Sequence, residues 1–406
     1  MANRRPPLEG IRVADFTWVW AGPFCTLQLA HLGAEVIRVE TAARTCVTRL
    51  LPPWADAEFG PNRSGYFNQY NQGKLSLSLD LKQPDGIRVA RDLAAKSDIV
   101  CENFAAGVMD RLGLGYEQLR AVRHDVIMIS LSGYGATGPE SEFVSYGPAQ
   151  VPLSGMSSLT GYAGWPPMHV GISYGDPNGG LHGAFAVLAA LLHRARTGEG
   201  QHIDLSQQET TVAVLAEGVL AQSMDGSAPE RDGNRDAWMS PHGVFRCDGP
   251  DRWVSLAVRS DREWLRFAEI VGGSDLAGDA RFASLALRKA NEDALEAIVT
   301  AWTSSMTAEK VTSLLQEAGV PAFPCMTNRD LAEDEHLRER DFFTYLDHPE
   351  VGARQHVGIP WKLHGSPVAV KRAAPCLGEH TEAVLREVLG YDGAEIQRLS
   401  EAGVLR

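Results

Sequence analysis

The residue with the clearest potential for chemistry is Asp176, which stands between glycines in the stretch GISYGDPNGGL, just before a long apolar run. An Asp at the start of a helix is a preferred N-cap, and we expect that role when no substrate is bound. The helix dipole would also favour the anionic form, and an ionised carboxylate can act as a covalent nucleophile. We expect Gly175, Gly179 and Gly180 to leave the backbone open to a bulky acyl group, with free amides available to an oxyanion. These residues alone leave both roles open.

The elements that must position Asp176 follow an alternating pattern of strands and helices. Short, nearly continuous apolar runs predict buried strands, and the segments between them predict helices. Such strand–helix–strand units form right-handed crossovers in a parallel sheet that is covered on both faces. The predicted strands span 11–16, 34–40, 98–104, 126–135 and 201–206, and the predicted helices span 23–33, 85–97, 179–196 and 207–223.

A polar, turn-rich stretch at 224–242 marks a domain boundary. Beyond it, 243–258 predicts a hairpin around an Asp–Gly–Pro turn, and helical patterns follow it. The fold class that we predict is therefore α/β, with a large domain over 1–225 and a smaller α+β domain over 226–330. The remaining segment, 331–406, is predicted to return to the large domain as a long, weakly structured connection that ends in a helix. The helices predicted for the small domain span 261–272, 291–305 and 307–318.

Composition argues against several kinds of partner and site. The formal net charge is −13, which argues against nucleic acid or an anionic membrane surface as a partner. The six cysteines are scattered without a CxxC pair, which argues against a disulfide framework or a zinc site and favours a cytoplasmic location. The N-terminal stretch lacks the pattern of a signal peptide, and no apolar run is long enough to span a membrane. We expect no metal, no nucleic acid and no membrane.

The first strand–helix–strand unit ends on the acidic residue Glu40, as a dinucleotide-binding unit does. It lacks the GxGxxG motif that such a unit needs. The turn reads TWVWAGPF, with Trp18 and Trp20 where a pyrophosphate would need small residues. These indoles either pack in the core or line a ligand pocket at the carboxyl end of a strand. The chain also lacks GxxxxGK[ST], HExxH and GxSxG motifs. The motifs therefore argue against the common nucleotide-binding and hydrolase sites.

Several collinear segments together resemble the class III CoA-transferases, the CaiB–BaiF family. The resemblance extends from about residue 7 to about residue 391 and is looser over 224–330. The segments that carry it are PLEGIRVADFTWVWAGPFCTLQLAHLGAEVIRVE, NQGKLSLSLDLKQPDG, DIVCENFAAGVMDRLGLGYEQL, SLSGYGATGP, GDPNGGLHGAFAVLAALLHRARTGEGQHIDLSQQE and APCLGEHTEAVLREVLG.

The resemblance implies a Rossmann-like sheet, a small domain and two chains threaded through each other as an interlocked homodimer. It implies transfer of CoA from an acyl-CoA to a free carboxylic acid, with coenzyme A as substrate and product. Asp176 then corresponds to the nucleophile, which forms mixed anhydrides and an aspartyl-CoA thioester. Matching positions place a set of residues at the CoA site: Val19, Trp20, Lys74, Asn103, Phe104, Arg111 and Tyr146.

Three departures concern the acid that the enzyme accepts. Some formyl-CoA transferases have Gln at the position of Trp20 and Glu at the position of Gly147. Their mobile glycine-rich loop is replaced here by GNRDAWMSPHG, which includes Trp238. Oxalate is therefore a poor prediction, and the extra indole rings favour a larger or more apolar acyl group.

Three rival functions use the same residues. An α-methylacyl-CoA racemase needs a second acid/base group opposite the Asp, and racemases of this superfamily place His where this chain has Tyr146. Intramolecular CoA transfer within one dicarboxylic acid would need only Asp176. A non-catalytic CoA-binding protein would not need the intact Asp motif at all.

Overall fold

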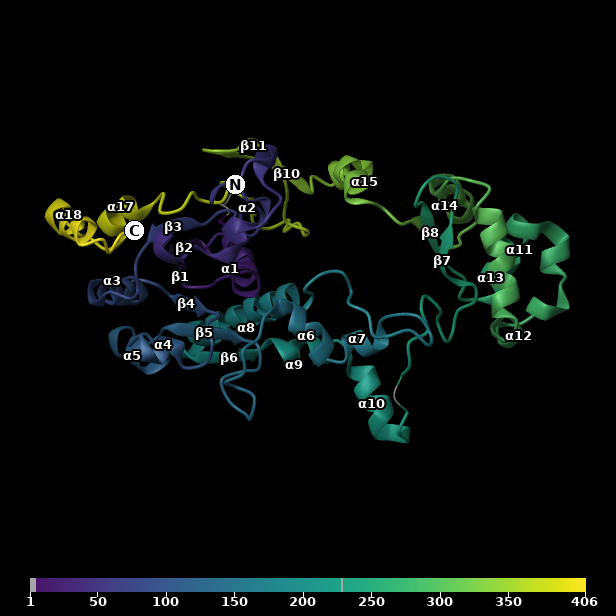
Figure 1. The fold of residues 1–406 in the computed structure, drawn as a ribbon, viewed down its shortest axis with the longest axis horizontal. Coiled ribbons are helices and arrows are strands. Elements are labelled where there is room, and N and C mark those ends of the chain that lie inside the picture. The colour runs from purple at the N-terminus through teal and green to yellow at the C-terminus, as the bar shows by residue number, and fades with distance from the viewer. Residues whose placement is uncertain (1–4, 228) are drawn as a thin grey trace. The chain divides into compact units, whose positions relative to one another are not determined.

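The computed structural model describes residues 5–227 and 229–406 and contains two compact units. The large unit is built from three stretches of the chain, which include the N-terminal half and the C-terminal segment from Leu337 (Figure 1). The small unit combines Ser158–Met168 with Pro229–His336. The short stretch Ser158–Met168 was not expected to group with the later segment. The predicted domain boundaries at 225 and 330 stay predictions.

The large unit contains a six-stranded sheet with the order β3-β2-β1-β4-β5-β6, in which every neighbouring pair is parallel. This is the doubly wound order in which ligands bind at the carboxyl ends of the strands. All five predicted strands are confirmed, whereas β3, with the sequence LSLS, was not predicted. The strands are β1 (Arg12–Asp15), β2 (Glu35–Glu40), β3 (Leu75–Ser78), β4 (Ile99–Glu102), β5 (Ile127–Ser132) and β6 (His202–Ser206).

Helices cover both faces of this sheet because successive strand side chains point to opposite sides. On one face, Val13 packs with α1 and α8, and on the other, Ala14 packs with α3, α5 and the C-terminal helices. The predicted helix 207–223 is interrupted at Val214 and forms two helices instead. The helices of this part of the chain are α1 (Ala21–His31), α2 (Gly65–Tyr70), α3 (Pro84–Ala95), α4 (Val108–Arg111), α5 (Tyr116–Val122), α6 (Gly147–Leu153), α7 (Met156–Leu159), α8 (Gly175–Thr197), α9 (Gln207–Ala213) and α10 (Ala216–Asp225).

The C-terminal segment is more ordered than the sequence indicated. It contains an antiparallel hairpin, β10 (Phe343–His348) with β11 (Gly352–Val357), and two short helices, α17 (Thr381–Ala383) and α18 (Gly393–Glu401). A π-helical turn at Val384–Val388 follows α17. The Ser78 amide donates to Thr381 Oγ1, and the yellow C-terminal ribbon lies beside β3 in Figure 1. This segment therefore closes the β3 edge of the large unit.

The small unit has a three-stranded sheet and its own apolar core. Its hairpin is confirmed as β7 (His242–Arg246) and β8 (Trp253–Ala257), and β9 (Ala322–Pro324) adds an unexpected third strand. A capping box between Ser260 and Glu263 fixes the start of the first long helix. The helices that follow Ser260 in the chain, before the hairpin of β10 and β11, are α11 (Asp261–Ala277), α12 (Leu285–Ala290), α13 (Glu292–Thr303), α14 (Ala308–Glu317), α15 (Asn328–Glu333) and α16 (Glu335–Glu339). No helix within the described residues is long and apolar enough to cross a membrane.

Candidate functional site

Asp176 lies inside the first turn of α8 and does not cap it. The helix begins at Gly175, earlier than predicted, and its N-cap residue Tyr174 makes no side-chain capping bond. The Asp176 amide donates to the Ser173 carbonyl at 3.0 Å, so its backbone is already part of the turn. The expected capping role is therefore wrong for α8. The carboxylate is free to interact with other elements, although the residue is only 6% exposed.

The partner of the Asp176 carboxylate is a different helix. The backbone N–H of Ala21, the first residue of α1, faces the carboxylate and favours its charged form. Gly147 packs against the other side, where a Cβ would lie 1.5 Å from Asp176 Oδ2. Burial raises the pKa of Asp176 to about 7, and the Ala21 amide opposes that shift. A carboxylate with this pKa is more basic than an ordinary Asp and is still substantially ionised at neutral pH.

The glycines that flank Asp176 serve packing rather than access. A Cβ on Gly180 would lie 2.7 Å from the Ala21 carbonyl oxygen, and one on Gly175 would lie 2.6 Å from Gln150 Cβ. Gly179 approaches the Gln207 side chain in the same way, at 3.0 Å. The expectation that these glycines leave room for an acyl group is therefore wrong, because protein atoms fill that space. Instead, Gly180 lets α1 approach α8 closely enough for the Ala21 amide to reach Asp176.

An aromatic cluster lies beside this carboxylate. Trp20 packs edge-on to Tyr66, with ring centroids 5.7 Å apart, and contacts Tyr70 at 5.2 Å. Burial raises the pKa of Tyr66, and the negative charge of Asp176 adds to the shift. Trp20 is 9% exposed and lines neither of the two cavities described below. Of the two alternatives for this indole, packing against neighbouring aromatic rings is the one that the structure shows.

A cavity of about 200 Å³ opens onto Asp176 at the carboxyl ends of the strands. We call it the Asp176 cavity. It brings together residues that the resemblance placed at the CoA site: Val19, Asn103, Phe104 and Tyr146 line it with Asp176. Asp176 is the one charged side chain among the described residues that line this cavity. A substrate that enters here meets a single carboxylate in mainly neutral surroundings.

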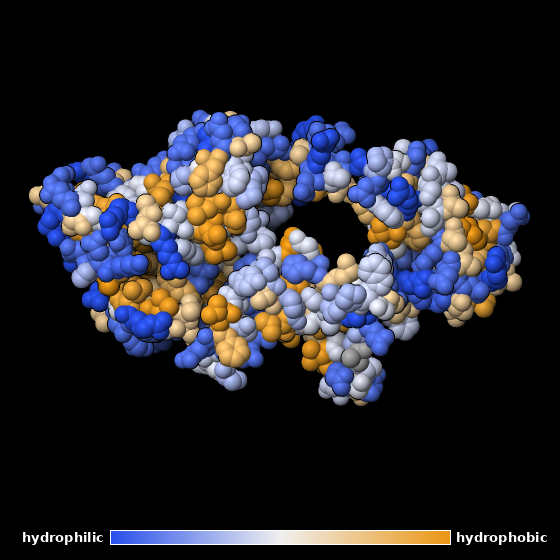
Figure 2. Space-filling view, viewed as in Figure 1, coloured by the Kyte–Doolittle hydropathy of each residue, from blue (hydrophilic) through white to orange (hydrophobic). Residues whose placement is uncertain are grey.

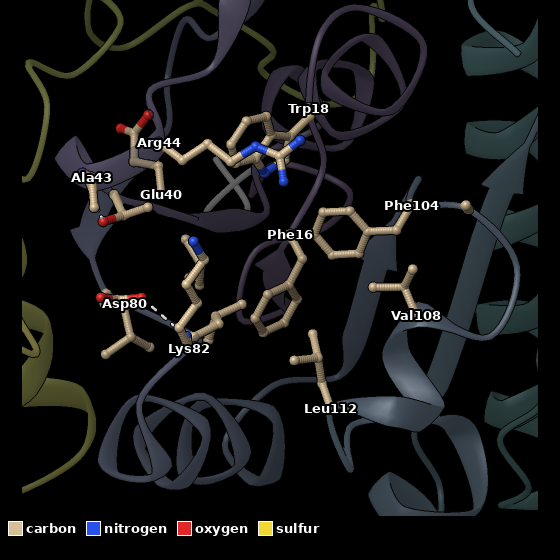
Figure 3. Close-up of a pocket in the computed structure, with 15 residues that line it drawn as sticks. Phe16, Trp18, Glu40, Ala43, Arg44, Asp80, Lys82, Phe104, Val108 and Leu112 are labelled. Atoms are coloured by element: carbon tan, nitrogen blue, oxygen red, sulfur yellow. Dashed lines mark hydrogen bonds between the residues drawn. The ribbon is translucent and has the colours of Figure 1, made fainter. Parts of the chain in front are cut away.

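A second, larger cavity of about 370 Å³ adjoins it, and we call it the strand-end cavity. Trp18 and Phe104 line both cavities, so the two are neighbours that share these residues as walls. Figure 3 shows Arg44 running along Trp18, with Lys82 on the same side of the cavity and apolar side chains opposite. The Arg44 guanidinium lies 5.3 Å from the Trp18 ring centroid. The apolar side chains are Phe16, Phe104, Val108 and Leu112.

Three of the predicted residues line neither cavity: Trp20, Lys74 and Arg111. Lys74 has no exposed surface, and its ammonium donates to Asp15 at 3.1 Å and to Thr26 Oγ1 at 2.7 Å. Burial lowers the pKa of Lys74 to about 8, while the charge of Asp15 opposes the shift. Arg111 is exposed at the end of α4 and lines neither cavity. Lys82 and Arg44, rather than Lys74, are the basic side chains that line the strand-end cavity.

Sequence reasoning missed four of the residues that shape the site. Lys82 could have been found, because it follows the apolar pattern LSLSLDL and parallel strands bind ligands at their carboxyl ends. Arg44 follows the second strand in the same way. No local signal marks the Ala21 amide or the contact of Gly147 with Asp176, since both depend on long-range packing. Within the described residues, no group of three or more His, Cys, Asp or Glu side chains could hold a metal ion.

Comparisons with known proteins agree over nearly the whole chain. The sequence model of CoA-transferase family III matches residues 8–381. A succinate–glutarate CoA-transferase from Agrobacterium fabrum is 34% identical over 96% of this chain and 97% of its own length. A formyl-CoA:oxalate CoA-transferase from Bradyrhizobium sp. is 32% identical over 98% of this chain and 97% of its own length. A CaiB/BaiF family protein from Brucella suis superposes with a TM-score of 0.86 at 30% identity, covering 95% of this chain and 100% of that one.

Proposed function

The chain belongs to CoA-transferase family III, and on that premise we propose that it moves CoA from an acyl-CoA donor to a free carboxylic acid through covalent intermediates on Asp176. The observation that carries the proposal is the position of this carboxylate. It is buried, the Ala21 amide faces it, and it is the one charged group in the described lining of its cavity. An isolated carboxylate of raised pKa suits nucleophilic attack on a thioester.

The chemistry balances without any further group. An Asp176 oxygen attacks the donor thioester carbonyl and expels CoA thiolate, which leaves a mixed anhydride. The thiolate then attacks the aspartyl carbonyl carbon, releases the donor acid and forms an aspartyl-CoA thioester. The acceptor carboxylate attacks that thioester, and the expelled thiolate attacks the acceptor carbonyl of the new anhydride. The products are the acceptor's CoA thioester and free Asp176.

The Ala21 amide would stabilise the charge that develops in these steps. It favours the charged form of the Asp176 carboxylate, so it is suited to stabilise the negative oxygen that develops there. Ala21 is the first residue of an 11-residue helix, whose dipole adds a positive potential at this end. The burial of Asp176 limits the access of water, which would otherwise hydrolyse the anhydride and thioester.

The strand-end cavity supports a site for the nucleotide end of CoA. Arg44 and Lys82 supply positive charge for phosphate groups in a protein whose net charge is −13. The apolar wall opposite them, including Phe16 and Leu112, offers a surface for the adenine ring. The pantetheine arm would then pass Trp18 and Phe104, which line both cavities, and bring the thioester to Asp176.

For the acceptor, we propose a carboxylic acid with a sizeable, largely uncharged body. The aromatic lining of the Asp176 cavity supports this class, because aromatic rings pack well on apolar groups; it includes Trp18, Phe104, Phe143 and Tyr146. The Asp176 cavity also holds no cation, among its described lining residues, that would pair with a second carboxylate. Competition between oxalate and longer monocarboxylic acids tests this, and preferred use of oxalate would overturn it.

The experiment for the whole proposal combines acyl-CoAs with a panel of acids and detects new thioesters by mass. We expect CoA exchange in the wild type, with a hydroxylamine-sensitive acyl adduct on Asp176 that is lost in Asp176→Ala. The matched control is Asp275→Ala, which removes an exposed carboxylate on α11 and should exchange normally. Deuterium incorporation at the α-carbon without an acceptor acid would instead indicate a racemase. Binding of CoA with neither reaction would indicate a non-catalytic protein.

We also propose that the functional form is an interlocked homodimer in the cytoplasm. One face of α8 packs against α1, whereas Leu181 (52%) and Phe185 (73%) on another face are exposed. Met224 on α10 is 82% exposed, and Figure 2 shows apolar side chains (orange) at the surface of the large unit among polar ones (blue). A second copy of the chain would cover such side chains. The free state of all six cysteines suits a reducing compartment.

A further inference from the structure

The turn between β1 and α1 contains an unfavourable backbone conformation at Val19. Its φ is +63°, a left-handed value that a β-branched residue rarely adopts, because the Cβ crowds the following carbonyl oxygen. A conformation of this kind persists only where the surroundings enforce it. Val19 lines the Asp176 cavity, so the strain lies at the site itself.

Asn103, at the end of β4, enforces this conformation from one side. Its Oδ1 accepts from the Trp18 amide at 2.7 Å, and its Nδ2 donates to the Trp18 carbonyl at 2.8 Å. Both polar groups of the residue before Val19 are therefore held by one side chain. Gly22 makes room for it, since a Cβ there would lie 3.1 Å from Asn103 Cγ.

A buried ion pair holds the turn from the other side. The Thr17 amide donates to Asp15 Oδ1 at 2.9 Å, and Lys74 binds Asp15 Oδ2 at 3.1 Å. Lys74 also donates to the Pro23 carbonyl at 3.0 Å, so it ties β1 to the first turn of α1. The turn is thus fixed at both ends, with Val19 between them.

This arrangement sets the direction of the Ala21 amide, which comes directly after the turn, where α1 packs closely on α8 at Gly180. That amide favours the charged form of Asp176. We propose that Asn103 is a positioning residue, which acts through the strained turn at Val19 in addition to lining the Asp176 cavity. This inference rests on the proposed function of Asp176. Release of the turn would let Val19 relax to negative φ and would withdraw the Ala21 amide from the carboxylate, which slows attack without removing the CoA site.

The test is a double-mutant cycle between Asn103 and Val19, with kcat and KM measured for CoA exchange. Glycine adopts positive φ without strain. In a Val19→Gly background the turn should therefore depend less on the hydrogen bonds of Asn103. We expect Asn103→Leu to lower kcat by about fivefold to a hundredfold in the Val19 protein. In the Val19→Gly background we expect the same substitution to lower kcat by less than about threefold. Val19→Ala is the matched control because alanine keeps a Cβ. In that background Asn103→Leu should lower kcat as much as it does in the Val19 protein.

Two outcomes would overturn the proposal: equal losses in the Val19 and Val19→Gly backgrounds, or a loss that appears only as a higher KM for acyl-CoA. Asn103→Asp, which keeps the acceptor for the Trp18 amide, gives a second cycle if Asn103→Leu folds poorly. The same double-mutant cycle can be measured with thermal midpoints, which do not depend on activity. If the wild type showed no CoA exchange, the proposed function would be refuted, and the thermal cycle would still test this inference. Lack of coupling between the two positions in both readouts would refute the inference alone.

Discussion

Replacing Asp176 by asparagine should abolish CoA transfer and at the same time stabilise the protein at pH 8. The structure raises the pKa of this carboxyl from 3.8 to about 7 through burial. A shift of about 3 pKa units, at 1.36 kcal/mol each, means that the folded state carries roughly 4 kcal/mol of unfavourable free energy when the group is ionised. A neutral amide removes that cost but adds buried N–H donors, which cost about 1–3 kcal/mol if left unsatisfied. The net expectation is a gain of about 1–3 kcal/mol at pH 8.

The gain must depend on pH in a particular direction. The folded-state pKa of Asp176 lies above the unfolded value, so between about pH 4 and pH 7 the folded protein binds more protons. Its contribution to stability therefore falls as pH rises through this range. At pH 4 the carboxyl is neutral in the folded state, and the asparagine variant should have no advantage or be slightly less stable.

Thermal midpoints of wild type and Asp176→Asn, at equal protein concentration and at several pH values, measure this difference. The exposed Asp275→Asn on α11 is the control and should show no such pH dependence. Transfer activity of Asp176→Asn should fall by at least about a thousandfold, since no other carboxylate among the described residues lines the cavity. If the variant were less stable at pH 8, or if the difference did not change with pH, the account of a costly buried carboxylate would be refuted.

Further predictions concern the surroundings of that carboxylate. The wild-type rate should rise with pH and level off above the Asp176 pKa of about 7, and a rate that is flat from pH 5 to 8 would contradict the raised pKa. Gly147→Ala should lower kcat about a hundredfold or more, because its Cβ would lie 1.5 Å from Asp176 Oδ2, whereas the control Gly393→Ala, with open space around it, should keep the wild-type rate. Lys82→Ala should raise KM for acyl-CoA about tenfold in steady-state assays and leave KM for an acyl-pantetheine unchanged; equal effects on both would remove Lys82 from the phosphate site. Phe185→Glu should convert a dimer to monomers in sedimentation experiments, and an unchanged sedimentation coefficient would place the interface elsewhere.

Local patterns in the sequence were enough to predict most of the sheet. The run AEVIRVE at 34–40 is rich in β-branched residues, which favours a strand, and the structure confirms it as β2. The strand β3 was not predicted, although its alternating LSLS is typical of a strand. Its partners are distant in sequence: the Ser76 hydroxyl donates to Glu40, and the Ser78 amide donates to Thr381. The hairpin β10–β11 was also missed, since its mostly polar strands pair with each other rather than within a core sheet.

The residues of the candidate site also differ in whether the sequence alone revealed them. Asp176 was identified from its own motif and from the other motifs that occur in the same order as in the family. Both signals depend only on the order of residues. Lys74 lies in the NQGK segment where the resemblance placed a cation, yet its ammonium is buried against Asp15, while Lys82, eight positions later, lines the cavity. Residue type and approximate position therefore did not reveal which lysine is exposed at the strand ends.

The sequence by itself determined the family and the alternation of strands and helices, and it singled out Asp176 as the proposed nucleophile, since each depends on a contiguous stretch or on the order of stretches. Only the tertiary structure decided what Asp176 touches. Ala21 and Gly147 reach Asp176 from 155 and 29 positions away, because the ends of parallel strands converge and the small Gly180 lets α1 approach α8. Contacts of this kind depend on how surfaces fit across the core, and no local pattern of residues encodes them.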